Sequence, residues 1–260
     1  MEQLRLSLIQ TDIAWEDKEK NLQHVNLKLD ELQGQTDLVI LPEMFSTGFT
    51  MNSRDLAEPI TGNTITTLQK LSQKYDVALT GSYIASDNQH YFNRGFFISP
   101  ENDPYFYDKR HLFRMGDEPE FFTAGQERTV IPYRGWNICL LVCYDLRFPV
   151  WSRNINNEYD LLLYVANWPE ARRDVWDCLL RARAIENMSY VVGTNRIGTD
   201  GNNLKYNGGS VVISPRGELL AASTNNKEHV INVTLSLSGL SAFRKKFPVW
   251  KDSDNFNIIS

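Results

Sequence analysis

Three short stretches of this chain are apolar over almost the whole length of a β-strand, and they cover residues 37–41, 138–143 and 160–166. A strand that alternates apolar and polar residues can leave one face in water. A strand that is apolar throughout must be covered on both faces. Such strands occur in sheets that have further layers on each side. The sequence therefore predicts a layered fold in which helices cover buried sheets.

Segments with helical spacing of apolar residues separate these strands. One begins near Glu16, and a second carries Ile65, Leu68, Leu71 and Tyr75. A third segment places Val175, Cys178, Ala182 and Ile185 on one stripe, which predicts that Cys178 lies in the core. Residues 91–99 with 105–109, and residues 209–214 with 219–223, have the pattern of hairpins, whereas residues 112–128 predict a long surface loop. We therefore expect one α/β domain with mixed sheets over residues 1–260.

Composition narrows the possible partners. A net charge of −5 without a Lys/Arg block argues against nucleic acid or an anionic membrane surface. No apolar run approaches the roughly 20 residues that span a bilayer, and the N-terminus does not resemble a signal peptide, so we expect a cytoplasmic protein. The four histidines lack metal-ligand spacing, and no nucleotide-binding glycine motif is present. These features favour a small-molecule substrate, with no metal and no cofactor.

The apolar run 138–143 ends at Cys143, and the polar sequence YDLRFP follows at once. A sharp turn from strand to helix holds a nucleophile up at the end of a rigid element, beside unpaired backbone N–H groups. Taken alone, Cys143 is more typical of a buried small apolar residue. The other two cysteines are Cys139, in the middle of the strand, and Cys178, on the helical stripe. We therefore expect Cys143 to be the only reactive thiol.

Two charged residues occupy places equivalent to that of Cys143. Glu43 and Lys109 each lie at the end of a predicted strand that is followed by a loop or turn. Strand ends of α/β sheets gather at one edge, where ligands usually bind. Either residue alone is most simply a solvated surface charge. Together with Cys143 they predict a site that combines a base, a cation and a thiol.

The local sequences around these residues are specific. Residues 41–45 (LPEMF), 108–113 (DKRHLF) and 143–149 (CYDLRFP), in this order and spacing, resemble the nitrilase (carbon–nitrogen hydrolase) superfamily. The resemblance extends from about residue 4 to residue 250. Residues 164–169 (YVANWP) and 181–187 (RARAIEN) are similar to the omega-amidase, or 2-oxoglutaramate amidase, branch.

This resemblance implies a four-layer α-β-β-α sandwich that assembles into a homodimer or a higher homo-oligomer. It also implies that Glu43, Lys109 and Cys143 form a catalytic triad, supported by Glu118 as a second glutamate. In the implied reaction, Glu43 takes the thiol proton and Cys143 attacks an amide carbon. Lys109 and the backbone N–H of Tyr144 hold the oxyanion, and water then hydrolyses the thioester. No cofactor is required.

Three further residues are candidates for substrate binding. Trp168 follows a strand end, so it is a candidate pocket wall, although a packing aromatic is the commoner case. Arg147 and Arg172 are candidates for binding a substrate carboxylate, because a carboxylate favours a bidentate donor. For each arginine a structural ion pair is an equal alternative, for instance between Arg147 and Asp145.

The same triad also fits other functions. A nitrilase or an N-carbamoyl amino acid hydrolase would share it, and an acyltransferase could pass the thioester to another nucleophile. A non-enzymatic interaction protein would tolerate loss of a triad residue, and none is lost here. The segment Asn167–Pro169 favours an amidase. We therefore expect ammonia release from a small α-keto acid amide such as 2-oxoglutaramate or 2-oxosuccinamate.

Overall fold

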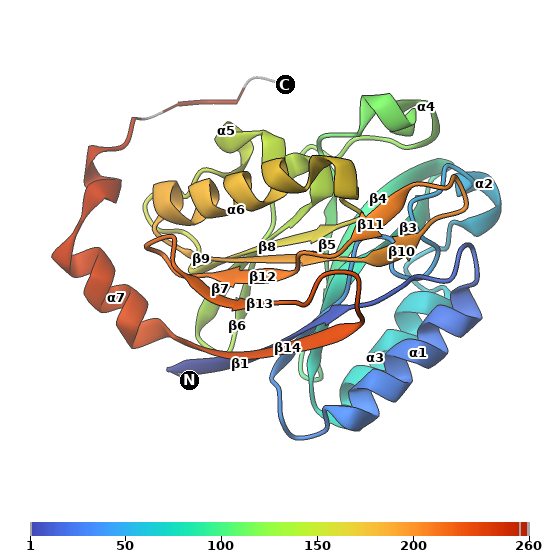
Figure 1. Cartoon of the computed structure of the whole chain (residues 1–260), viewed down its shortest axis with the longest axis horizontal. Helices are drawn as coiled ribbons and strands as arrows, with labels where there is room; N and C mark the ends of the chain where they lie inside the picture. Colours follow the sequence, from blue (N-terminus) through green and yellow to red (C-terminus); the bar gives the residue numbers. More distant parts are fainter. Residues whose placement is uncertain (1, 255, 259–260) are drawn as a thin grey trace.

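The apolar strands of the sequence lie inside two six-stranded sheets in the computed structural model, which describes residues 2–254 and 256–258 (Figure 1). The first sheet has the order β14-β1-β2-β3-β4-β5. Its strands are β1 (Gln3–Gln10), β2 (Leu38–Ile40), β3 (Ala78–Asp87), β4 (His90–Ile98), β5 (Tyr105–Asp108) and β14 (His229–Ser236). The second sheet has the order β13-β12-β9-β8-β7-β6. Its strands are β6 (Val130–Tyr133), β7 (Trp136–Val142), β8 (Leu161–Ala166), β9 (Tyr190–Asn195), β12 (Val211–Ile213) and β13 (Leu219–Ala222).

Strand direction brings the ends of several strands to one edge. In the first sheet β1, β2 and β3 are parallel, and in the second β7, β8 and β9 are parallel. Strand β5 is antiparallel to β4, which is itself antiparallel to β3, so β5 runs in the direction of β3. The carboxyl ends of β2 and β5 therefore point the same way. Glu43 and Lys109 follow these two ends.

Helices cover the outer faces of both sheets. Figure 1 shows α1 (Lys18–Glu31) and α3 (Asn63–Tyr75) beside the first sheet, and α5 (Pro149–Ser152) and α6 (Arg173–Asn187) over the second. The helix α7 (Leu237–Lys246) follows β14 and extends away from the sheets. The inner faces of the sheets pack on each other. The predicted α-β-β-α sandwich of mixed sheets is confirmed.

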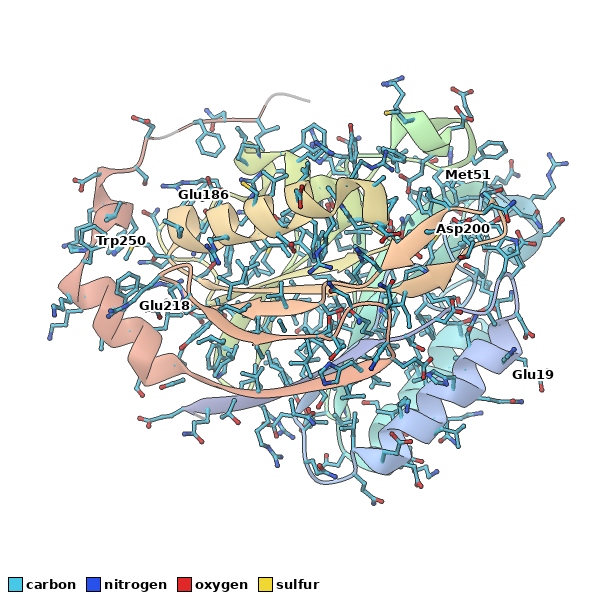
Figure 2. The ribbon with its side chains drawn as sticks, in the orientation of Figure 1. Glu19, Met51, Glu186, Asp200, Glu218 and Trp250 are labelled. Atoms are coloured by element: carbon cyan, nitrogen blue, oxygen red, sulfur yellow. The ribbon has the colours of Figure 1, made fainter. Side chains whose placement is uncertain are left out.

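Close packing between the sheets fixes their separation. Buried side chains from both sheets fill this space, as the sticks in Figure 2 show, and β8 is buried along its whole length. A Cβ atom on Gly95 of β4 would lie 3.0 Å from Leu140 Cδ2 of β7. Real Cβ atoms seldom come so near to a neighbour. A side chain at this position would therefore require Leu140 to shift.

The predicted buried stripe of α6 was wrong. Cys178 and Ile185 are exposed, and the buried face of the helix instead contains Trp176, Leu180, Arg183, Ala184 and Asn187. Two polar side chains can lie on this face because they have partners there: Arg183 donates to the Leu146 carbonyl at 2.6 Å, and Asn187 accepts from the Asn154 N–H at 2.9 Å. A stripe chosen by apolar residues alone misses such a face.

Two other segments differ from the prediction. A hairpin of β10 (Ile197–Thr199) and β11 (Lys205–Asn207) lies outside both large sheets and was not predicted. The predicted loop 112–128 contains short helical turns, among them α4 (Glu118–Phe121), and its Glu118 is fully buried. In the part of the chain that the structure describes, no helix is both long enough and apolar enough to cross a bilayer.

Candidate active site

The turn at the end of β7 raises the Cys143 side chain as the sequence predicted. Cys143 has a φ of 44° and begins the 3-10 helix η2 (Cys143–Arg147). A non-glycine residue in this left-handed region costs on the order of 1–3 kcal/mol, so the surrounding structure must hold it there. Asp145 contributes by accepting the Val142 N–H at 3.0 Å.

Asp145 also joins this turn to the chain that follows β5. Its Oδ2 accepts the Tyr107 hydroxyl at 2.8 Å, and its Oδ1 accepts the His111 N–H at 3.0 Å. The His111 ring nitrogen Nδ1 lies 2.8 Å from the same Oδ1. Both carboxylate oxygens of Asp145 thus have hydrogen-bond partners other than Arg147. The suggested ion pair between Arg147 and Asp145 was wrong. The network instead fixes the position of Cys143 relative to Lys109, two residues before His111.

Lys109 lies between two carboxylates. Its Nζ is 2.9 Å from Glu43 Oε1 and 2.8 and 3.0 Å from the two oxygens of Glu118, and all three side chains are fully buried. Burial lowers the pKa of Lys109, but the Glu118 and Glu43 carboxylates outweigh this effect and raise it above the ordinary value. Burial raises the pKa of Glu118, against the opposing effect of Lys109. The predicted base, cation and second glutamate thus form one cluster.

Two asparagines that the sequence analysis missed hold the carboxylates. Asn93 Nδ2 donates to Glu43 Oε1 at 2.8 Å and to Glu118 Oε1 at 3.0 Å. The backbone N–H of Asn167 donates to Glu43 Oε2 at 2.8 Å. A signal was present in each case, because Asn93 lies inside strand β4, where asparagine is uncommon, and Asn167 directly follows β8.

The three cysteines differ strongly in environment. Burial, followed by the charge of Glu43, raises the pKa of Cys143 well above its ordinary value, against the lowering effect of Lys109. Its thiol is therefore protonated at neutral pH and needs a base. Burial raises the pKa of Cys139 to about 12, consistent with an inert residue. Cys178 is exposed, so the expectation that it is shielded from labelling is corrected.

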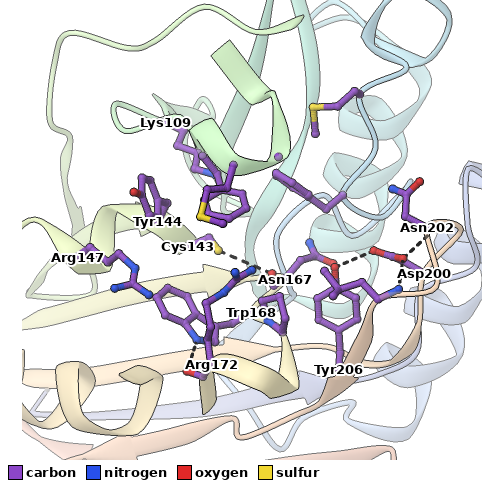
Figure 3. A pocket seen from close by; sticks show the side chains of 17 residues that line it. Lys109, Cys143, Tyr144, Arg147, Asn167, Trp168, Arg172, Asp200, Asn202 and Tyr206 are labelled. Atoms are coloured by element: carbon purple, nitrogen blue, oxygen red, sulfur yellow. Dashed lines mark hydrogen bonds between the residues drawn. The ribbon is translucent and has the colours of Figure 1, made fainter. Parts of the chain in front are cut away.

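A cavity of about 300 Å³ opens above Cys143 (Figure 3). Of the residues predicted from the sequence, six line it: Lys109, Cys143, Tyr144, Arg147, Trp168 and Arg172. Glu43 and Glu118 lie behind Lys109 instead. The unpredicted hairpin β10–β11 completes another wall through Asp200, Leu204 and Tyr206. The cavity is at the end of the molecule where Figure 2 labels Met51 and Asp200.

The two arginines of the cavity stack on aromatic rings. Arg147 Cζ lies 5.3 Å from the centre of the Trp168 ring, and Arg172 Cζ lies 5.1 Å from that of Phe113. Among residues 2–254 and 256–258, neither guanidinium has an acidic group within 4.0 Å. In the same described ranges, no group of three or more His, Cys, Asp or Glu side chains could hold a metal ion.

Proteins of known family are similar to this chain in sequence. The family model for carbon-nitrogen hydrolases matches residues 5–245. The chain belongs to the carbon–nitrogen hydrolase family. The omega-amidase YafV of Escherichia coli K12 is 44% identical over 257 residues, which cover 98% of each chain. The 2-oxoglutaramate amidase of Bacillus subtilis is 30% identical over 251 residues, or 95% of this chain and 96% of that one.

A solved carbon–nitrogen hydrolase has the same fold. XC1258 from Xanthomonas campestris, a CN-hydrolase superfamily protein with an arsenic adduct in the active site, has a TM-score of 0.96 and 41% sequence identity. The alignment covers 99% of this chain and 100% of that one. The predicted superfamily and the predicted enzyme class, carbon–nitrogen hydrolase, are both confirmed.

Proposed function

We propose that this carbon–nitrogen hydrolase cleaves the terminal amide of a small α-keto acid amide, through a thioester on Cys143. One observation carries the proposal: a thiol, a buried ammonium and two arginines line the same cavity of about 300 Å³, and among the described residues neither arginine has an acidic group within 4.0 Å. The first two groups suit attack on an amide carbonyl. The arginines suit a carboxylate at the other end of the same molecule.

Acylation begins with a proton transfer, because the Cys143 thiol is protonated at rest. Glu43 takes that proton while sulfur attacks the amide carbon, and the carbonyl electrons move onto oxygen. The Lys109 ammonium stabilises the oxyanion together with the Tyr144 N–H, which lies in the first turn of η2, where backbone donors lack helical acceptors. When the C–N bond breaks, the proton on Glu43 goes to nitrogen, and ammonia leaves.

Deacylation repeats these steps with water as the nucleophile. Glu43 removes a proton from water, the oxygen attacks the thioester carbon, and the proton passes to the departing sulfur. The Glu118 carboxylate places a second negative charge beside Lys109. The ammonium therefore stays protonated through both half-reactions. The sum of both half-reactions is amide plus water to carboxylic acid plus ammonia, which at neutral pH are present as carboxylate and ammonium.

The two ends of the cavity determine the proposed orientation of the substrate. With the amide carbon beside Cys143, the keto acid end extends toward Arg147 and Arg172, and the Trp168 ring forms the wall beneath Arg147. The Trp168 indole N–H donates to the Arg172 carbonyl at 2.8 Å, which fixes that wall. The names of the E. coli and B. subtilis relatives, an omega-amidase and a 2-oxoglutaramate amidase, support a substrate of this kind.

A panel of compounds tests the proposal. Ammonia release is measured for 2-oxoglutaramate, 2-oxosuccinamate, glutamine, an aliphatic nitrile and an N-carbamoyl amino acid, with Cys143→Ala as the blank. We expect the two keto acid amides to be cleaved fastest. Glutamine should be poorer because its ammonium group would face the arginines. A preference for nitriles or carbamoyl compounds would contradict the proposed substrate.

The same panel separates hydrolysis from acyl transfer. If ammonia release in water stops after about one equivalent per site and intact-protein mass spectrometry finds a thioester on Cys143, then adding amine or hydroxyl acceptors tests an acyltransferase. Continued ammonia release over many turnovers in water, without any acceptor, supports the hydrolase.

A further inference from the structure

Asn93 contacts all three charged residues of the buried cluster. Its side-chain Nδ2 donates to Glu43 Oε1 at 2.8 Å and to Glu118 Oε1 at 3.0 Å, and its backbone carbonyl accepts the Lys109 N–H at 3.0 Å. The Asn93 side chain is fully buried and does not line the cavity. One neutral residue therefore holds both carboxylates and the start of the lysine-bearing segment.

The orientation of this amide is fixed by its other side. Asn93 Oδ1 accepts the Ser82 hydroxyl at 2.9 Å, and the Ser82 oxygen itself accepts the Met44 N–H at 2.8 Å. The single Ser82 proton goes to Asn93 Oδ1, and an oxygen lone pair remains for the Met44 N–H. The NH₂ group must then face the two carboxylates, which only accept when ionised. Hydrogen bonds thus connect the Met44 N–H through Ser82 and Asn93 to the carboxylate of Glu43, the residue before Met44.

Lys109 alone cannot hold these carboxylates through a reaction. Its ammonium has three protons, and its three contacts at 2.8, 2.9 and 3.0 Å all go to Glu43 and Glu118. Stabilising an oxyanion requires at least one of those protons to turn toward the substrate. At that moment the carboxylates lose a donor, whereas both hydrogen bonds from the Asn93 amide remain.

We propose that Asn93 is a positioning residue that keeps Glu43 and Glu118 in place as anions while Lys109 serves the oxyanion. An amide suits this role because it donates two hydrogen bonds yet neither gains nor loses a proton near neutral pH. The inference rests on the proposed roles of Glu43 and Lys109. A residue needed only for packing would affect stability and leave the proton chemistry unchanged.

Two substitutions separate these possibilities. Asn93→Asp keeps the shape but places a third carboxyl beside Glu43 and Glu118, with Lys109 as the facing cation and the Cys143 thiol nearby. The extra negative charge makes the cluster retain a proton, so the base form of Glu43 appears at higher pH. We expect the acidic limb of kcat/KM to move upward by about one pH unit or more. Asn93→Leu removes both donors, and we expect kcat to fall about 100-fold, the scale of a misplaced catalytic group.

In both variants KM should change little, because Asn93 does not reach the cavity. Asn154→Asp is the matched control: Asn154 is buried, and its Nδ2 donates to the Tyr159 and Asn187 carbonyls far from Lys109. This control should lower the melting temperature without moving the pH profile. The rate of iodoacetamide alkylation at Cys143, followed by peptide mass spectrometry against pH, gives a readout that needs no substrate.

The outcomes are distinct. An upward shift of the alkylation profile in Asn93→Asp but not in Asn154→Asp supports the proposal, even if no amide is cleaved and the proposed substrate is wrong. Wild-type pH profiles and kcat in both Asn93 variants, with a lower melting temperature, would overturn it. Failure of both Asn93 variants to fold would also count against it, because Asn93 would then be a folding residue.

Discussion

Lys109 and the pair Arg147 and Arg172 line the same cavity, but only Lys109 is neutralised by the protein itself. The ammonium is fully buried between Glu43 and Glu118, whereas each guanidinium is half-buried and stacks on an aromatic ring. A buried charge must have a partner in the folded protein. A half-buried charge can leave its partner to the ligand. Under the proposed function, the side of the cavity with Lys109 serves the reaction, and the side with the two arginines binds the charged end of the substrate.

Removing the positive charge on each side of the cavity should give the largest difference, which is a difference in the free energy of unfolding. Lys109→Met leaves Glu43 and Glu118 buried without a counter-charge, and such a loss typically costs about 3–5 kcal/mol of stability. Arg147→Met and Arg172→Met lose no internal ion pair and should stay within about 0.5 kcal/mol. Urea unfolding measures the difference. Equal losses on both sides would refute the distinction.

Replacing Lys109 by arginine preserves the positive charge but changes its shape. This change therefore tests only the side of the cavity where Lys109 lies. The compact ammonium fits between three carboxylate oxygens, and a planar guanidinium cannot take its place without displacing the substrate carbonyl. We expect Lys109→Arg to lower kcat by about 10²–10³, nearly as much as Lys109→Ala. An arginine variant within a few-fold of wild type would show that only the charge matters.

The substrate side should respond through affinity. A hydrogen-bonded charge pair is worth about 1.5–3 kcal/mol, so Arg147→Gln or Arg172→Gln should lower kcat/KM for 2-oxoglutaramate by about 10- to 100-fold, mainly through KM. Butyramide, which has no carboxylate, serves as the matched substrate and should be cleaved equally by wild type and variants. A parallel loss for both compounds would instead point to a structural role of the arginine.

The smallest effect concerns the exposed thiol. Cys178→Ser should leave kcat within about two-fold of wild type, as expected of an exposed residue that does not line the cavity. In wild type, brief iodoacetamide treatment should modify both Cys178 and Cys143, whereas the Cys178→Ser variant should carry one adduct, on Cys143. A bound keto acid should protect only Cys143. Labelling of Cys139 would contradict its buried position.

Much of the chemistry could be predicted because it lies where strands end. Lys109 and Cys143 directly follow β5 and β7, Glu43 lies three residues after the end of β2, and the direction of these strands determines where their ends meet. The residues that hold them are harder to find. Asparagine is more typical of turns than of strands, but Asn93 lies inside β4. Only the folded structure shows that its side chain donates hydrogen bonds to two carboxylates.

The errors in the fold have a related cause. The buried face of α6 is set by Trp176 and by Arg183 and Asn187, whose polar groups find partners that no sequence pattern reveals. The strands β10 and β11 have three residues each, too short for an alternating pattern, and the polar residues 200–203 separate them. Long apolar strands were therefore predictable, and short or polar segments that depend on tertiary contacts were not.

The hairpin of β10 and β11 makes one wall of the cavity from a separate two-stranded sheet. Tyr206 and Asp200 brace it internally, since the tyrosine hydroxyl donates to the carboxylate at 2.8 Å. New side chains at its tip can reshape that wall while the register of both six-stranded sheets is retained. Under the proposed function, changes at this hairpin tip would alter substrate preference and leave Cys143, Lys109 and Glu43 in place.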